Sequence, residues 1–278
     1  MNKTAAVIGG GFAGVEAAVQ LARAGVHVDL YEMKPHRFSP AHSSENLAEL
    51  VCSNSFKAER LASAAGLLKT EMERLGSLCV ECAKKTKVPA GGALAVDRDL
   101  FSAMVTQRIE QTENITVIRR EVSALPQADC VIIAAGPLAS DALSPVLNEL
   151  CGEGLHFFDA AAPIVSADSI DPAFSFAQSR YDRGGEDDYI NCPMNKEEYE
   201  VFYEALITAE GAHLHEVDKK KDVYEGCMPI EVLAKRGADS IRFGPKKPVG
   251  LRDPRTGHRP WAVLQLRAEN TERTLYNL

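Results

Sequence analysis

A glycine-rich turn near the amino terminus constrains the fold of this chain more than any other feature. Residues 4–9, TAAVIG, form a short apolar run typical of a buried strand, and GGGFAG at residues 9–14 matches G-x-G-x-x-G. Apolar residues then recur at helical spacing until Gly25, and a second apolar run, VHVDLYE, ends at Glu32. This order of strand, turn, helix, strand and acid predicts a Rossmann-like α/β fold that binds a dinucleotide.

Each position of this motif has a physical role. Gly9 permits the tight turn, Gly11 lets a pyrophosphate approach the backbone, and Gly14 lets the helix pack closely on the strand. The helix amino terminus offers N–H groups and the positive end of a dipole to the phosphates. Since FAD and NAD share adenosine diphosphate, the motif does not separate them. The expected cofactor-binding residues, with Glu32 on the ribose, are Gly9, Gly10, Gly11, Phe12, Ala13, Gly14 and Glu32.

Composition narrows the class of protein. The chain has 278 residues and a net charge of −8, with 45% hydrophobic and 25% charged residues, which excludes disorder as its main state. No stretch approaches the roughly 18 to 20 consecutive apolar residues that span a bilayer, so we expect a cytoplasmic protein with no membrane contact. Seven cysteines at irregular spacing argue against a disulfide scaffold and leave free thiols.

Two of these cysteines lie in polar or glycine-containing segments. Cys52 lies in LVCSNSFK and Cys227 in YEGCMPIE, where a ligand can approach the backbone closely. Cys130 lies in the apolar run ADCVII, which favours a buried structural thiol. Cys79 and Cys82 form the only C-x-x-C, and since no second pair supplies zinc ligands and no thioredoxin-like pattern surrounds them, we expect neither a metal site nor a redox pair.

Several other elements are readable from local signals. The runs 115–122 and 128–137 predict strands, the second ending in a Gly-Pro turn. Asp97 is a predicted N-cap for a helix that continues to about Gln111. Asn195 with Glu198 three residues later resembles a capping box at the start of another helix.

Residues 235–267 are strongly basic although the whole chain is acidic. A local positive surface can bind a phosphate backbone whatever the net charge, and Trp261 and Phe243 are available for stacking. A solvated face, or one that pairs with flavin phosphates, is the open alternative. This segment contains two aspartates, Asp239 and Asp253. Its nine basic residues are Lys235, Arg236, Arg242, Lys246, Lys247, Arg252, Arg255, Arg259 and Arg267.

Seven segments together identify a family resemblance: GGGFAGVEAA, LYEMKP, LVCSNSFK, PAGGALAVDRDLFS, YEGCMPIEVLAKRG, RFGPKKPVGL and PWAVLQLRAEN. From the amino terminus to the last residue, the chain resembles the folate- and FAD-dependent tRNA uracil C5-methyltransferases. The resemblance implies a FAD-binding domain of the glutathione-reductase type with an inserted α/β substrate domain. We expect these over residues 1–165 and 166–278.

The resemblance also implies an activity. The family uses FAD, reduced by NAD(P)H, to take a one-carbon unit from methylenetetrahydrofolate and deliver it as methyl to the T-loop uridine in the T-arm of tRNA. Carbon C5 of uracil becomes nucleophilic only when a soft nucleophile adds at C6, so the chemistry needs a thiolate. By segment match Cys52 and Cys227 are the two catalytic cysteines. We expect Cys52 to be the thiolate and Cys227 the partner that handles the proton.

The same resemblance makes the basic segment a tRNA-binding surface, with expected contacts at Arg242, Lys246, Lys247, Arg252 and Arg255. Family members are considerably longer, and the chain stops at RTLYNL, before the segment expected to complete the FAD site and part of the folate pocket. Two alternatives stay open. One is a FAD-dependent protein of tRNA wobble-uridine modification, whose cysteine motifs lie in different segments, and the other is a non-catalytic flavin- or RNA-binding remnant. The sequence does not predict an oligomeric state.

Overall fold

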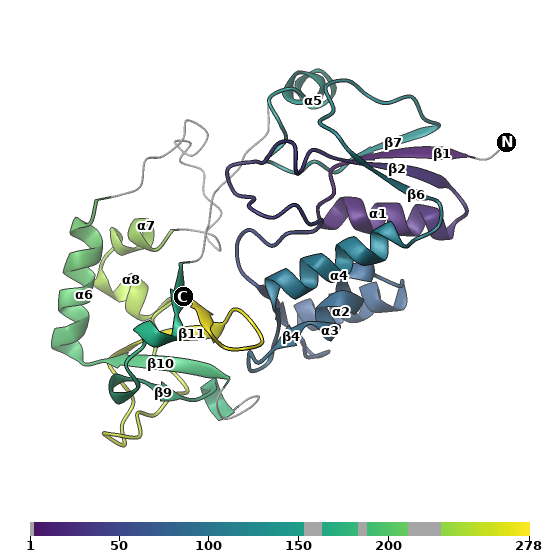
Figure 1. The fold of residues 1–278 in the computed structure, drawn as a ribbon. Helices are drawn as coiled ribbons and strands as arrows, with labels where there is room; N and C mark the ends of the chain where they lie inside the picture. Colours follow the sequence, from purple (N-terminus) through teal and green to yellow (C-terminus); the bar gives the residue numbers. More distant parts are fainter. Residues whose placement is uncertain (1–2, 153–162, 183–187, 211–228) are drawn as a thin grey trace. The chain divides into compact units, whose positions relative to one another are not determined.

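The computed structural model describes residues 3–152, 163–182, 188–210 and 229–278. The chain folds into two compact units that interleave along the sequence (Figure 1). Unit 1 comprises Met1–Val51, Ala64–Thr86 and Val96–Phe157, and unit 2 comprises Cys52–Ser63, Lys87–Ala95 and Phe158–Leu278. The chain therefore passes between the units several times, whereas a single boundary was expected at residue 165. The assignment of 1–165 to FAD and 166–278 to the substrate stays a prediction.

A parallel four-stranded sheet forms the centre of unit 1. Its strand order is β6-β2-β1-β7, so that β1 lies between β2 and β7. The positions of β1 and β2 on either side of the glycine turn confirm the predicted Rossmann-like α/β fold. The strand bounds are β1 (Thr4–Ile8), β2 (His27–Glu32), β6 (Ile115–Arg119) and β7 (Cys130–Ile133).

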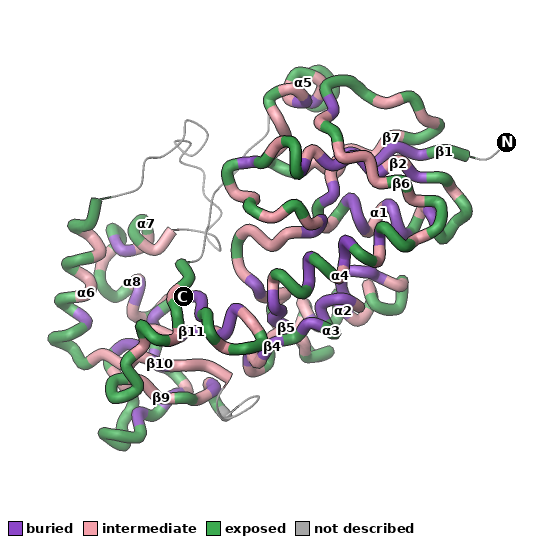
Figure 2. Tube along the Cα trace, in the orientation of Figure 1, coloured by how far each residue is buried: buried purple, intermediate pink, exposed green. Residues whose placement is uncertain are grey.

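Helices cover both faces of this sheet. Because side chains of a strand alternate between faces, Val7 and Leu30 are paired neighbours on one face and Ile8 and Tyr31 on the other. The second pair packs in one apolar cluster with Leu147 of α5, and the buried stretches of β1, β2 and α1 are visible in Figure 2. The helices are α1 (Phe12–Arg23), α2 (Ala64–Arg74), α3 (Leu78–Lys85), α4 (Arg98–Glu110) and α5 (Ser144–Cys151).

The predicted N-cap of α4 is confirmed, whereas the expected burial of Cys130 is wrong. The Asp97 carboxylate accepts a hydrogen bond from the backbone N–H of Leu100 at 3.0 Å. Cys130 is exposed, because it is the first residue of β7 and β7 is one of the two edge strands of the sheet. An apolar run alone does not separate the start of an edge strand from the middle of a central one.

Unit 2 is built on a five-stranded antiparallel sheet of order β8-β12-β11-β10-β9. A three-stranded sheet of order β3-β5-β4 is made by residues from much earlier in the chain. The large sheet contains β8 (Ile164–Ser166), β9 (Phe176–Ala177), β10 (Tyr189–Met194), β11 (Ala262–Ala268) and β12 (Leu275–Asn277), and the small one β3 (Ser55–Ala58), β4 (Lys87–Val88) and β5 (Ala93–Val96).

Three helices belong to unit 2: α6 (Lys196–Thr208), α7 (Ile230–Ala234) and α8 (Ala238–Arg242). The predicted capping box is confirmed, since Asn195 and Glu198 bond each other's backbone N–H at 2.8 Å. Two tyrosine hydroxyls on α6 tie the helices together by donating to carbonyls, Tyr199 to Ala238 and Tyr203 to Ala234.

One tyrosine connects the early and late segments of unit 2. The Tyr189 hydroxyl, on β10, donates to the carbonyl oxygen of Ala90 at 2.6 Å. Next to it, the Asp188 carboxylate accepts from the backbone N–H of Gly91 at 2.7 Å. Residues 87–95 are thus bonded to a strand that lies about a hundred positions later in the sequence.

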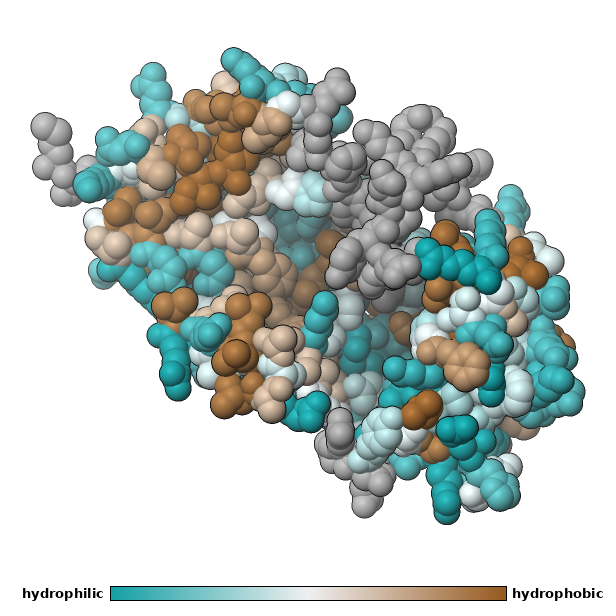
Figure 3. Space-filling view, turned by 180° about the vertical axis from the view of Figure 1, so that it is seen from behind, coloured by the Kyte–Doolittle hydropathy of each residue, from teal (hydrophilic) through white to brown (hydrophobic). Residues whose placement is uncertain are grey.

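The surfaces of the two units differ in polarity on the face shown in Figure 3. Apolar atoms gather over parts of unit 1, whereas hydrophilic atoms dominate unit 2. Exposed leucines of unit 1 include Leu67 and Leu68 on α2 and Leu75 just after it. Within the described ranges, no helix is both long and apolar enough to cross a bilayer.

Candidate functional site: a nucleotide cavity and the Cys52 segment

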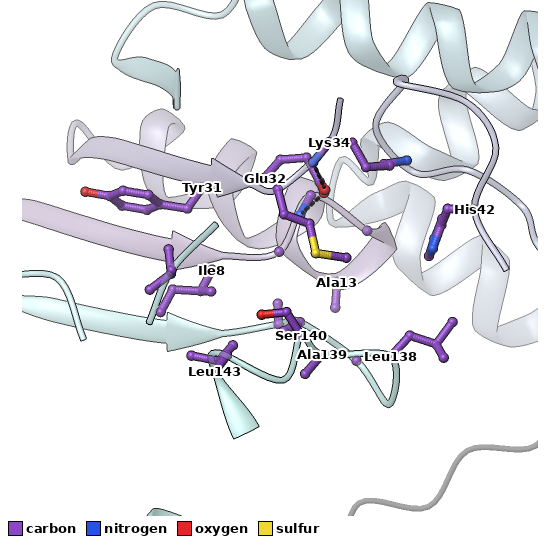
Figure 4. A pocket seen from close by; sticks show the side chains of 18 of the residues that line it. Ile8, Ala13, Tyr31, Glu32, Lys34, His42, Leu138, Ala139, Ser140 and Leu143 are labelled. Atoms are coloured by element: carbon purple, nitrogen blue, oxygen red, sulfur yellow. Dashed lines mark hydrogen bonds between the residues drawn. The ribbon is translucent and has the colours of Figure 1, made fainter. Parts of the chain in front are cut away.

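A cavity of about 310 Å³ lies at the carboxyl ends of three parallel strands in unit 1 (Figure 4). Residues 9–13 follow β1, residues 32–34 begin with the last residue of β2, and residues 134–140 follow β7, and all three segments line it. Strand β1 lies between β2, which follows it in the chain, and β7, which the chain reaches only after β6 at the far edge of the sheet. Open α/β sheets bind ligands in the crevice outside such a switch point.

The three motif glycines have different surroundings. Gly9 has φ of +104°, and a Cβ there would lie 2.6 Å from the carbonyl oxygen of Ala134. A Cβ at Gly14 would lie 1.8 Å from the carbonyl oxygen of Gly9, so the helix packs against the turn at a distance that only glycine allows. At Gly11, which lines the cavity, no described atom lies within 4 Å of such a Cβ. The backbone at Gly11 is therefore open to a ligand.

Glu32 joins the glycine turn to the end of β2. Its Oε2 accepts from the backbone N–H of Gly10 at 2.9 Å and its Oε1 from that of Lys34 at 3.0 Å. The residue is buried and lines the cavity. Because a carboxylate offers about four acceptor positions, these two bonds leave it able to accept from a hydroxyl group as well.

The amino terminus of α1 supplies a partial positive charge, which is complementary to an anionic ligand such as a pyrophosphate. Its N-cap, Gly11, has no side chain to cap the first N–H groups, and no acidic residue lies in its first turn. The dipole of this 12-residue helix therefore favours an anion at the turn. Phe12 and Ala13 line the cavity too, and the ring of Phe12 stacks on Phe101 of α4 at 5.5 Å between centroids.

The motif did not indicate Lys34, His42 and Glu49, which also line the cavity. The Lys34 ammonium lies 3.1 Å from the Glu49 carboxylate and donates to the carbonyl oxygen of Asn46 at 2.6 Å. Burial and the Lys34 ammonium lower the pKa of His42, whose ring is therefore neutral near pH 7. The polar run HSSEN, between Glu32 and Cys52, is the one sequence signal that could have pointed to this segment.

The Lys34–Glu49 pair makes stability depend on pH. Burial raises the pKa of Glu49, but the backbone N–H groups of Ser43 and Ser44 and the Lys34 ammonium outweigh it, so the pKa lies below its ordinary 4.5. A lowered pKa contributes stability that is fully present above the unfolded value and is lost as pH falls through the folded value.

We therefore expect Glu49→Gln to flatten the acid side of the stability curve. At pH 7 the variant should lose roughly 2 kcal/mol of unfolding free energy, because Lys34 keeps no anionic partner there. Thermal melts of both proteins should converge as pH is lowered below about 4.5, the ordinary pKa of the group. The exposed Glu113→Gln variant is the control, and a constant gap between Glu49→Gln and the parent at every pH would contradict the assignment.

Cys52 is exposed and directly follows Val51, which lines the cavity. By compactness Cys52 is the first residue of unit 2. Its expected partner, Cys227, falls in 211–228 and lies outside the described residues. The meeting of the two thiols at one pyrimidine ring therefore stays a prediction.

The C-x-x-C pair lies on α3, and both residues are buried. Burial, reinforced by the Glu16 carboxylate, raises the pKa of Cys79, and burial also raises that of Cys82. Both thiols are therefore protonated at neutral pH. In the part of the chain that the structure describes, no group of three His, Cys, Asp or Glu side chains could hold a metal ion.

Two of the five expected tRNA contacts, Arg242 and Lys246, are not exposed. The Arg242 guanidinium lies 3.6 Å from the ring centroid of Trp261 and 4.6 Å from that of Phe243, and its Nε donates to the carbonyl of Trp261. Lys246 is buried, and this burial lowers its pKa to about 8, against an opposing effect of Cys192.

The other three expected contacts, Lys247, Arg252 and Arg255, are exposed. Arg255 forms a two-pronged pair with the Asp253 carboxylate, at 3.1 and 3.0 Å, and donates to the carbonyl oxygen of Ala173. Lys247 and Arg252 therefore present their charge to solvent more freely than the rest of the predicted set.

Comparison with known proteins decides the family. The model of the glucose inhibited division protein A (GIDA) family matches residues 4–278. The chain is 56% identical over 279 residues to methylenetetrahydrofolate–tRNA-(uracil-5-)-methyltransferase TrmFO of Lactobacillus helveticus, covering all of this chain and 68% of that protein. The chain belongs to the GIDA family, and within it to TrmFO. The recognised resemblance is thereby confirmed.

Other TrmFO proteins give similar matches. The protein of Acetivibrio thermocellus is 58% identical over 98% of this chain, and that of Geobacter sulfurreducens is 55% identical over the whole of it. The chain spans 62% and 64% of their lengths. These identities do not favour the wobble-uridine alternative.

A solved structure supports the fold. Aquifex aeolicus GidA, in its form I crystal, superposes with a TM-score of 0.59 at 14% identity, over all of this chain and 52% of that one. The form II crystal gives a TM-score of 0.58 at 13% identity. At these identities the likeness shows only that this chain and GidA share a fold.

Proposed function

We propose that this TrmFO chain carries the nucleotide-binding and nucleophile-bearing parts of an enzyme that methylates C5 of the T-arm uridine of tRNA, with FAD as cofactor and methylenetetrahydrofolate and NAD(P)H as co-substrates. One observation carries the proposal: the segment that ends in Val51 lines the dinucleotide cavity, and Cys52 follows it directly. The names of the relatives supply the methyl donor and the acceptor.

The residues at the cavity fit the adenosine diphosphate half of FAD. The open backbone at Gly11 and the positive end of α1 suit a pyrophosphate, and the Glu32 carboxylate suits a ribose hydroxyl. When bound and reduced, FAD supplies the redox chemistry that carries the one-carbon unit and completes the methyl group. His42 lines the same cavity, and its imidazole would be available to hydrogen-bond an uncharged part of the cofactor.

Cys52 activates the uracil ring in this proposal. Its thiolate forms a bond to C6, and the electrons of the C5–C6 double bond move toward C5 and the O4 carbonyl, which makes C5 nucleophilic. After C5 has bonded to the one-carbon unit, a base removes the C5 proton, a role we assign to Cys227. The electron pair of that C–H bond forms a double bond from C5 to the one-carbon unit as the bond between this unit and its carrier breaks. A hydride, which reduced FAD would supply, then adds to this methylene carbon, the C5–C6 double bond forms again, and the Cys52 thiolate leaves.

The exposed basic residues provide a test of RNA contact. Each phosphate that a side chain neutralises steepens the salt dependence of binding by roughly 0.7 to 0.9 in log–log slope. Replacing Lys247 and Arg252 together by alanine should therefore lower the slope for T-arm binding by about 1.5. The exposed Arg74→Ala, on α2, is the control, and an unchanged slope in the double variant would remove these residues from the RNA surface.

The function itself is tested by reconstitution. The purified chain is incubated with FAD, and flavin absorbance after gel filtration reports binding. Methyl transfer from methylenetetrahydrofolate to a T-arm transcript is then measured beside a TrmFO protein of full relative length. Flavin retention with transfer to C5 supports the proposal. A chain that stays colourless under saturating FAD favours the non-catalytic remnant instead.

A further inference from the structure

We propose that Arg267 is a positioning residue for the Cys52 thiol, an inference that rests on the proposed function and extends it to a residue more than two hundred positions away. Arg267 lies on β11 of unit 2, at the end of the basic segment 235–267. Its guanidinium bonds to the two residues that follow Cys52.

The contacts are specific in both partner and direction. Arg267 Nε donates to Asn54 Oδ1 at 2.8 Å, and its Nη2 donates to Ser53 Oγ at 2.7 Å. The same Nη2 donates to Asn277 Oδ1, on β12, at 3.0 Å. Arginine presents several N–H donors in a rigid plane, so these bonds fix residues 53 and 54 against the sheet in one orientation.

Two of the acceptors of Arg267, Asn54 and Asn277, are held in place by further hydrogen bonds. Asn54 has none of its surface exposed, and its amide donates to the carbonyl oxygen of Ala268 at 2.9 Å. The amide of Asn277 donates to Asn54 Oδ1 at 2.9 Å and to the buried carboxylate of Glu269. A buried polar network of this kind is rigid as long as its members are satisfied.

Glu269 also brings a negative charge to the network that contains the Arg267 guanidinium. The cation is therefore accompanied by a carboxylate inside the protein, and its role is to orient rather than to present charge at the surface.

Cys52 lies between two anchored stretches of chain. Before it, the carbonyl oxygen of Leu50 accepts from Arg98 Nη1 at 2.8 Å, within unit 1. After it, Ser53 and Asn54 are bonded to Arg267, within unit 2. Consecutive Cα atoms are about 3.8 Å apart, so the anchors at Ser53 and Asn54, one and two positions after Cys52, restrict where its side chain can point relative to unit 2.

Positioning predicts a particular kinetic effect. A nucleophile displaced by about 1 Å can cost roughly 100-fold in rate even though the substrate still binds. We therefore expect Arg267→Met in the FAD-loaded chain to form the Cys52 adduct with a fluorouracil-containing T-arm RNA 10- to 100-fold more slowly, with little change in the half-saturating RNA concentration. Arg267→Lys keeps the charge but not the planar donors, so it should not restore the rate.

A second measurement does not depend on methyl transfer. Hydrogen exchange of the amides of residues 53–58 should accelerate in Arg267→Met, whereas exchange in β1 should not change. Ser53→Ala removes one Arg267 bond with little risk to folding, and it should show the same changes on a smaller scale. Arg74→Met, an exposed arginine on α2, is the matched control for both measurements.

The outcomes separate the two proposals. Slower adduct formation with faster exchange at residues 53–58 supports the positioning role. Unchanged exchange in Ser53→Ala and in a folded Arg267→Met overturns it, as does full rescue of the rate by Arg267→Lys. If the parent forms no Cys52 adduct but Arg267→Met still accelerates exchange, Arg267 holds the segment and the proposed function alone fails.

Discussion

Replacing Cys52 by alanine is expected to abolish the covalent adduct with a fluorouracil-containing T-arm RNA and to lower methyl transfer by a factor on the order of 10⁴ or more. The physical reason is that no other group then adds to C6, so C5 keeps its unreactive double bond. Denaturing electrophoresis of labelled RNA measures the adduct, and transfer from methylenetetrahydrofolate measures the overall reaction.

The chain offers matched controls for this experiment. Cys130 and Cys151 are exposed thiols of unit 1, and alanine at either position should leave the adduct intact. Alanine at Cys227 should slow the complete reaction but spare the adduct, because fluorouracil has no C5 proton for a base to remove. An adduct that survives Cys52→Ala and disappears in Cys227→Ala would exchange the two roles.

Gly14→Ala is expected to unfold unit 1 or to destabilise it by about 3 kcal/mol or more. The added methyl group would lie 1.8 Å from the carbonyl oxygen of Gly9, and neither the turn nor the helix can move away without breaking the close approach of α1 to β1. Thermal melting followed by circular dichroism measures the loss, and flavin content should fall with it.

Gly11→Ala separates folding from ligand binding at the same turn. Gly11 has φ of −74°, which alanine adopts readily, and the space around its Cβ position holds no described atom. The variant should therefore melt like the parent but bind FAD roughly tenfold more weakly, because its methyl group occupies the path of a pyrophosphate. Equal melting temperatures in Gly11→Ala and Gly14→Ala would contradict this division of roles.

Local signals in the sequence predicted those features of unit 1 that depend on interactions between residues close together in the chain. The order of β1, turn, α1 and β2, the close packing at Gly14 and the N-cap at Asp97 follow from backbone sterics and hydrogen-bonding rules that act over a few residues. The capping box at Asn195 belongs to the same class.

Features that depend on distant contacts were not predictable in this way. Lys246 sits in a basic segment and was expected at the RNA surface, but the fold buries it. Cys130 lies in an apolar run but begins an edge strand and is exposed. The bond from Arg267 to Asn54 joins residues 213 positions apart, and no spacing rule indicates such a pair.

Each unit is made of three separate stretches of the chain, which limits where the chain can be cut into fragments and when each unit can fold during synthesis. A fragment that ends at residue 165 would keep residues 87–95 but lose Tyr189, whose hydroxyl bonds to Ala90. This part of the unit 2 core would then lack a residue that packs against it. During synthesis on the ribosome, Asn54 in the segment 52–63 cannot form its hydrogen bonds to β11 and β12 until those strands have been translated. The Cys52 segment thus reaches its final place only after β11 and β12 have been made.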